Sequence, residues 1–138
     1  MSKFLSVSLI AASLLLTSNY PTLAGTCASR CGPPPLQVKP GQYIRIQVVN
    51  KTYRTLKIED AQARKQISLV SGQELYFDRE GVTEPNLSIL FWDEEGRSLQ
   101  GVVSKPNPWI LRLEIRPNNR YPSDRSLYIL NDGRVNVF

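Results

Sequence analysis

The stretch WILRLEIR, residues 109–116, decides the fold. Its residues alternate in character, in the order Trp109, Ile110, Leu111, Arg112, Leu113, Glu114, Ile115 and Arg116. A period of two places successive side chains on opposite faces of a β-strand. The odd-numbered apolar row can therefore face a core while the even-numbered, mostly charged row faces away. The stretch predicts a strand that is buried on one face.

The same kind of pattern recurs between turn signals along the rest of the chain. The further stretches are 43–50, 54–59, 66–70, 74–78, 86–93, 98–103, 126–130 and 134–138. Residues 86–93 are apolar on both faces, which is typical of a central strand covered on both sides. Asn131-Asp132-Gly133 predicts a hairpin. After the N-terminal leader, no stretch with helical periodicity is longer than residues 60–65. We therefore expect an all-β fold of eight or nine short strands, in a single antiparallel β-sandwich or a related barrel.

The N-terminus has the organisation of an export signal. Lys3 precedes an apolar run at 4–16 that is too short for a comfortable membrane span, and Thr22-Leu23-Ala24 offers small residues for cleavage. A core helix is one alternative, and a lipid-anchored protein is another, although Thr26 separates the small residues from Cys27. We expect a signal peptide at 1–24, a Cys- and Pro-rich arm at 25–36 and a β-sandwich domain at 37–138. No later stretch is long enough to span a membrane, so the expected location is secreted or periplasmic.

The only two cysteines, Cys27 and Cys31, lie four positions apart in TCASRCGPPP, residues 26–35. If the residues between them form one helical turn, the two α-carbons come within roughly 6 Å, which suits a disulfide. In an oxidising compartment we expect this bond to form and to order the arm more than the core. An intermolecular or redox role and a metal site are the alternatives. Metal sites usually recruit imidazole or more sulfur, and the chain has no histidine.

VKPGQYIRI, residues 38–46, together with Asn50, resembles the opening of cupredoxin-like and related secreted β-sandwich domains. This resemblance implies a cupredoxin- or immunoglobulin-like sandwich. It does not imply copper binding, because the histidine ligands are absent and both cysteines lie at the opposite end of the chain. The leader followed by TCASRCGPPP resembles small exported proteins of cyanobacterial type, a resemblance that implies no activity.

The composition excludes several classes of function. The chain has 17 Lys and Arg against 12 Asp and Glu, and the basic residues are interspersed with carboxylates. This mixture disfavours nucleic acid as a partner and favours anionic glycans or phospholipid head groups. The alternative is that the net charge serves only solubility. The absence of histidine removes Ser-His-Asp and Cys-His catalysis and most metal hydrolase chemistry. We expect no enzymatic activity, no cofactor and no metal site. The run Asp93-Glu94-Glu95 predicts a solvated turn, with calcium binding as the alternative.

The strongest candidate for a binding site is the loop RPNNRYPSDR, residues 116–125. Arg116, Arg120 and Arg125 offer guanidinium groups that suit carboxylate, sulfate or phosphate, and Tyr121 offers a ring that can stack on a sugar. In the alternative interpretation, Glu114 and Asp124 pair locally with these arginines. Trp92 and Trp109 favour core packing over a sugar-stacking role.

We therefore expect an exported, non-enzymatic β-sandwich that acts as a binding or interaction module. Its partner would be an anionic polysaccharide or another component of the cell envelope. The alternative is a structural or assembly subunit that exchanges an edge strand or its arm with a neighbouring chain. An enzyme of unrecognised type is the third possibility.

Overall fold

The computed structural model describes residues 34–79 and 87–138, and this part of the chain contains nine strands and no helix. The strands are β1 (Ile44–Asn50), β2 (Leu56–Asp60), β3 (Lys65–Leu69), β4 (Glu74–Arg79), β5 (Leu87–Asp93), β6 (Leu99–Asn107), β7 (Ile110–Pro117), β8 (Ser126–Ile129) and β9 (Val135–Val137). Each coincides with a stretch predicted from the alternation. The largest difference is at β6, which continues beyond the predicted end at residue 103.

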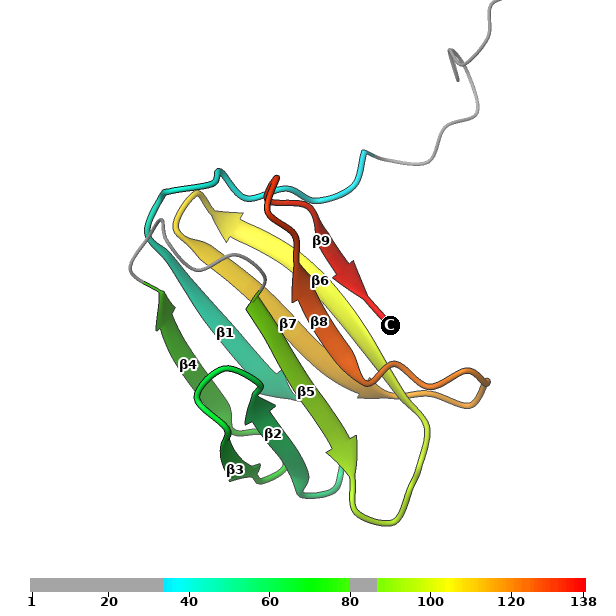
Figure 1. Ribbon diagram of the computed structural model, residues 1–138. Coiled ribbons are helices and arrows are strands. Elements are labelled where there is room, and N and C mark those ends of the chain that lie inside the picture. Colours follow the sequence, from blue (N-terminus) through cyan, green and yellow to red (C-terminus); the bar gives the residue numbers. More distant parts are fainter. Residues whose placement is uncertain (1–33, 80–86) are drawn as a thin grey trace, which may run out of the picture. The chain divides into compact units, whose positions relative to one another are not determined.

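The strands form two sheets that overlie each other (Figure 1). The four-stranded sheet has the order β4-β1-β7-β6, and the five-stranded sheet has the order β3-β2-β5-β8-β9. This arrangement confirms the expected all-β sandwich. One pair differs from the expected antiparallel arrangement, because β1 and β7 run parallel, with Val48 opposite Leu113.

The core lies between the sheets and is made by the inward-facing rows of the strands. Leu111, Leu113 and Ile115 of β7 are fully buried, as the alternation predicts. The partly buried Phe77 of β4 packs against the edge of this core. Alternate residues of β5 and β7 are thus removed from water, and this kind of burial supplies most of the free energy that favours folding.

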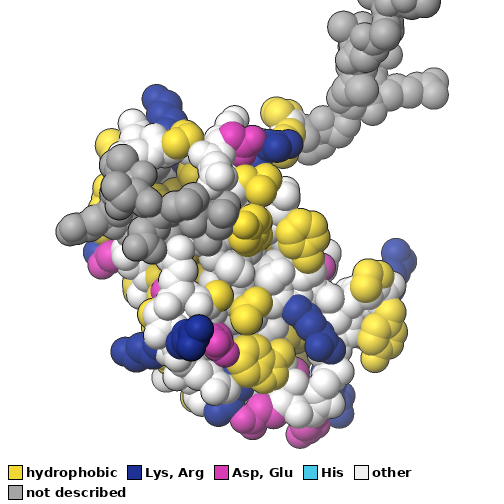
Figure 2. Space-filling model, viewed as in Figure 1, with side chains coloured by type: hydrophobic (Ala, Val, Ile, Leu, Met, Phe, Trp, Pro, Cys, Tyr) yellow, Lys and Arg dark blue, Asp and Glu magenta, His cyan; other side chains and the backbone are white. Residues whose placement is uncertain are grey.

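The burial of Trp109 and of β5 differs from the sequence prediction. Trp109 is in the turn between β6 and β7 and exposes 54% of its surface, so the prediction that it packs in the core is wrong. β5 is buried on one face only, because Leu90 and Trp92 are half-buried on the outer face of the five-stranded sheet, where hydrophobic side chains reach the surface (Figure 2). The expectations that both faces of this strand are covered and that Trp92 packs in the core are also wrong.

A buried polar cluster closes one end of the sandwich around Asn50, the last residue of β1. The Asn50 side chain is fully buried, and its Nδ2 donates to the carbonyl oxygens of Arg54 (2.6 Å) and Leu69 (2.8 Å). Its Oδ1 accepts from the backbone N (2.9 Å) and the hydroxyl (2.7 Å) of Thr52. The amide therefore joins β1 to the segments that begin β2 and end β3, with every donor and acceptor satisfied.

The chain that precedes β1 docks along the opposite end of the five-stranded sheet. Val135 N donates to the Leu36 carbonyl (3.0 Å), and Val38 N donates to the Gly133 carbonyl (2.8 Å). Gly133 has a φ of +84°, and a β-carbon there would lie 1.8 Å from the Val38 oxygen. Only glycine therefore permits this contact.

Several sequence predictions fall outside the described residues. Cys27 and Cys31 lie there, as does the expected leader at 1–24, so the disulfide and the signal peptide stay predictions. Within residues 34–79 and 87–138, no helix has the length and hydrophobicity that crossing a membrane would need.

Candidate binding surface

The loop between β7 and β8 is tied to the start of β6 by its backbone. Asn118 N donates to the Ser98 carbonyl (3.0 Å), and Asp124 N donates to the Leu99 carbonyl (2.9 Å). The Ser98 hydroxyl in turn donates to the Arg120 carbonyl (2.9 Å). These bonds fasten the loop near both of its ends and at its middle. The side chains of the loop are thus presented from a backbone that is already ordered.

The only carboxylate of this loop does not neutralise its arginines. Asp124 Oδ2 accepts a hydrogen bond from the backbone N of Gly101 on β6 (2.8 Å). Within the described residues, the exposed side chains of Arg120 and Arg125 have no ion pair or hydrogen bond. Tyr121, between them in the sequence, exposes 84% of its surface. Two cations and one aromatic ring of the predicted site therefore remain available to a ligand.

Arg116, the fourth predicted residue, lies on the outer face of the four-stranded sheet near the end of β7. Its Nε and Nη2 donate to Glu114 Oε2 at 3.2 and 2.5 Å. This is the local pairing that the sequence left open as an alternative, and it holds for Arg116 but not for Arg120 or Arg125. No contact within the described part of the chain joins Arg116 to the three loop residues.

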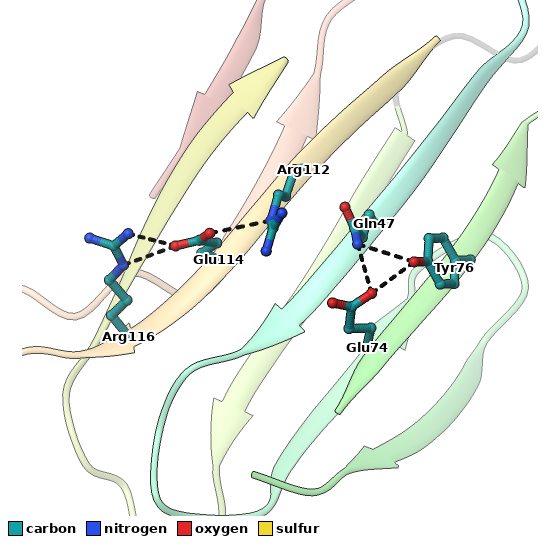
Figure 3. Close-up of polar contacts among 6 residues, drawn as sticks. All are labelled: Gln47, Glu74, Tyr76, Arg112, Glu114 and Arg116. Carbon is teal, nitrogen blue, oxygen red and sulfur yellow. Dashed lines mark hydrogen bonds and ion pairs between the residues drawn. The ribbon is translucent and has the colours of Figure 1, made fainter. Parts of the chain in front are cut away.

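Glu114 also contacts a second arginine, as Figure 3 shows. Arg112 Nε lies 3.2 Å from Glu114 Oε1, so one carboxylate is shared between two guanidinium groups. This Nε is buried, and its contact with Glu114 lacks the geometry of a hydrogen bond. The alternation had placed all three residues on one face, and the structure shows that Glu114 pairs with both arginines.

A second polar group on this face was not predicted, and we call it the Gln47 triad: Gln47, Glu74 and Tyr76 (Figure 3). Gln47 Nε2 donates to Glu74 Oε2 (2.7 Å) and to the Tyr76 hydroxyl (3.1 Å). The Tyr76 hydroxyl donates to the same Glu74 oxygen (2.7 Å). The three residues meet because β1 pairs with β4, with Gln47 opposite Tyr76 and Val49 opposite Glu74. The sequence placed Gln47 on a polar face but did not identify its neighbouring strand.

These contacts shift the titration of the carboxylates. The hydrogen bond from Arg116, followed by the positive charges of Arg116 and Arg112, lowers the pKa of Glu114. Hydrogen bonds from Tyr76 and Gln47 lower the pKa of Glu74. A carboxylate whose pKa is lower in the folded chain than in the unfolded chain stabilises the fold above the unfolded pKa. That contribution is lost as the pH falls through the folded pKa.

We therefore expect the free energy of unfolding to fall in acid. The fall is expected to be smaller for the Glu114→Gln variant than for the wild type. The Gln variant is expected to be less stable than the wild type at pH 7, with a difference that shrinks below about pH 4, where the carboxylate becomes protonated. Urea unfolding at several pH values measures this difference, with Glu59→Gln on the other sheet as a control. A constant difference between pH 7 and pH 2 would contradict the prediction.

The acidic turn Asp93-Glu94-Glu95 borders an open hollow of about 490 Å³, lined by these residues and by Tyr53, Arg54 and Thr55. Its carboxylates already have partners. Glu94 pairs with Lys57 (3.1 Å), Glu95 pairs with Arg54, and Asp93 Oδ1 accepts from the backbone N of Glu95 (2.7 Å). Within the described residues, no group of three or more acidic, His or Cys side chains could hold a metal ion. The turn is thus an ion-paired surface element.

The candidate binding surface therefore has two parts: the loop with Arg120, Tyr121 and Arg125, and the outer face of the four-stranded sheet. What each part binds has to be inferred from its own side chains. Comparison of the chain with protein-family models, with curated proteins and with solved structures finds no match in any of the three.

Proposed function

We propose that the protein is an exported, non-enzymatic binding module that recognises an acidic polysaccharide through Arg120, Tyr121 and Arg125. One observation carries the proposal: the only carboxylate of the loop, Asp124, is held by the backbone N of Gly101. The two guanidinium groups therefore keep their charge and their hydrogen-bond donors for a ligand. An arginine fork matches the planar carboxylate or sulfate of an acidic sugar.

The surroundings of the loop suit such a ligand. The loop backbone is held by hydrogen bonds to the start of β6, so little ordering is needed when a ligand binds. The exposed ring of Tyr121, which follows Arg120 in the sequence, offers an apolar surface. The excess of Lys and Arg over Asp and Glu favours the approach of a polyanion. Arg116 is not part of this site, because Glu114 neutralises it.

We expect the protein to bind immobilised polygalacturonate and not dextran, an uncharged polysaccharide. The double substitution Arg120→Ala/Arg125→Ala is expected to weaken binding about tenfold or more without changing the melting temperature. Raising the NaCl concentration from about 0.05 M to about 0.5 M should weaken wild-type binding, since exposed charges are screened. Biolayer interferometry measures both effects.

The matched control is Arg97→Ala/Arg134→Ala, which removes the same charge from two arginines that have carboxylate partners. Equal loss in both double variants would mean that only net charge matters. Binding that neither the loop substitutions nor salt alters would show that the loop is structural. Binding to anionic lipid vesicles but not to polygalacturonate would assign the loop to a membrane surface instead.

A further inference from the structure

The outer face of the four-stranded sheet differs from the loop in its charge. Three arginines lie on it, and each lies against a carboxylate of the same face. Arg45 pairs with Asp78, and Glu114 is shared by Arg112 and Arg116. Glu74, in the Gln47 triad, supplies the third negative charge, and the charge of Lys51, which follows β1, also acts on Glu74 and Glu114. An anion has little to gain here, because each arginine already has a carboxylate beside it.

Arg112 nevertheless has hydrogen-bonding capacity that the fold leaves unused. None of its N–H groups makes a hydrogen bond within the described residues, although the side chain is only 30% exposed and its Nε is buried. A guanidinium group has five N–H donors in a planar fork. Donors that make no hydrogen bond in a partly buried position are unfavourable. A ligand with paired hydroxyl oxygens would accept hydrogen bonds from the Nη donors, which are not buried.

Gln47 lies directly opposite Arg112 on the neighbouring strand and has complementary capacity. Its Nε2 is held by Glu74 and the Tyr76 hydroxyl, whereas its Oε1 accepts no hydrogen bond from the described part of the chain. The Gln47 side chain is only 8% exposed although it faces outward, so its position is fixed by its neighbours. A donor fork and an ordered amide acceptor thus lie side by side on adjacent strands (Figure 3).

Tyr76 adds an apolar surface to this pair of polar groups. Its hydroxyl is held by Glu74 and Gln47, and the guanidinium carbon of Arg45 lies 5.7 Å from the centre of its ring. The residue still exposes 49% of its surface. An aromatic ring whose orientation is set by hydrogen bonds can receive the C–H face of a pyranose at a small entropic cost.

We infer that Arg112, Gln47 and Tyr76 form a binding site for an uncharged saccharide, separate from the anion site proposed for the loop. The sugar ring would lie on Tyr76, with hydroxyl oxygens accepting from Arg112 and a hydroxyl donating to Gln47 Oε1. Glu74 and Glu114 hold their partners in place and can accept from further hydroxyl groups. Because the saccharide carries no charge, binding should depend on shape and hydrogen bonds, and it should change little with salt.

The test uses neutral hexasaccharides, so that no charge on the probe can engage the loop. Cellohexaose, laminarihexaose, maltohexaose, chitohexaose, mannohexaose and xylohexaose are titrated into the 15N-labelled protein. At least one is expected to bind, with chemical-shift changes centred on β1, β4 and β7. Tyr76→Ala and Arg112→Gln should each weaken that binding about tenfold or more. Tyr76→Phe, which keeps the ring, should weaken it less.

Matched controls separate the site from general effects. Tyr53→Ala removes an aromatic residue that is 94% exposed and lies outside this face, and Arg97→Gln removes an exposed arginine of the loop between β5 and β6. Neither should alter saccharide binding, and the amide spectrum of each variant reports whether it is folded. The Arg120→Ala/Arg125→Ala protein should also bind the neutral probe normally, so the two proposals can fail independently. Binding to none of the six probes, or equal binding by wild type and folded Tyr76→Ala, would overturn the inference.

Discussion

Replacing Phe91 by alanine is expected to lower the free energy of unfolding by about 3–5 kcal/mol. Phe91 is the largest fully buried side chain of the core, and it lies at the middle of β5. It reaches the other sheet, because a β-carbon added to Gly101 of β6 would lie 3.3 Å from its Cζ. The substitution would therefore leave a cavity between two sheets that cannot collapse fully. In a domain whose total stability is about 5–15 kcal/mol, this is a large fraction.

Urea unfolding followed by far-ultraviolet circular dichroism measures the effect as a fall in the midpoint at unchanged slope. The matched control is Phe138→Ala, because Phe138 exposes 63% of its surface. That substitution is expected to change the stability by no more than about 0.5 kcal/mol. Similar losses for the two variants would show that Phe91 is not central to the core.

The second large effect is expected at Asn50. Asn50→Ala removes four hydrogen bonds at once and leaves the carbonyls of Arg54 and Leu69 and the backbone N of Thr52 without that partner. A buried polar group that loses its partner is destabilising by about 1–3 kcal/mol. Because several such groups lie together, we expect a total loss of about 3 kcal/mol or more.

Asn50→Asp sharpens this test, since it keeps the size of the side chain. The substitution replaces the Nδ2 donor by an oxygen that faces two carbonyl oxygens, so it should destabilise the fold about as much as Asn50→Ala at pH 7. Asn107→Ala is the matched control, because Asn107 is exposed and its Oδ1 makes one hydrogen bond, with Trp109 N. A loss for Asn50→Ala no larger than that for Asn107→Ala would contradict the structural role of the buried amide.

The candidate binding surface was only partly predictable. The types of residue in the loop identified Arg120, Tyr121 and Arg125, and the alternation placed Arg112, Glu114 and Arg116 on one face. One decisive contact joins segments that are distant in sequence, and the other is made between two residues of β7. Asp124 is held by Gly101, and Arg116 is neutralised by Glu114, whereas the sequence offered both carboxylates equally to the arginines.

The Gln47 triad was missed because its contacts join residues that are distant in sequence. Its members lie on β1 and β4, which are separated along the chain by two strands of the other sheet. Ser71-Gly72-Gln73 has the composition of a turn, and composition alone does not show that the chain changes sheets there. β4 pairs with β1 and not with β3, which precedes it.

By itself, the sequence determined where the strands lie, within a few residues at their ends, and for most strands the face that turns to the core, with β5 as the exception. This information is local, because the direction of a side chain follows from its position along its own strand. The tertiary structure alone decided the order of the strands, the parallel pairing of β1 with β7 and the side chains that share each outer face. Those features depend on backbone hydrogen bonds and burial between residues far apart in the chain, and many pairings are compatible with the same alternation.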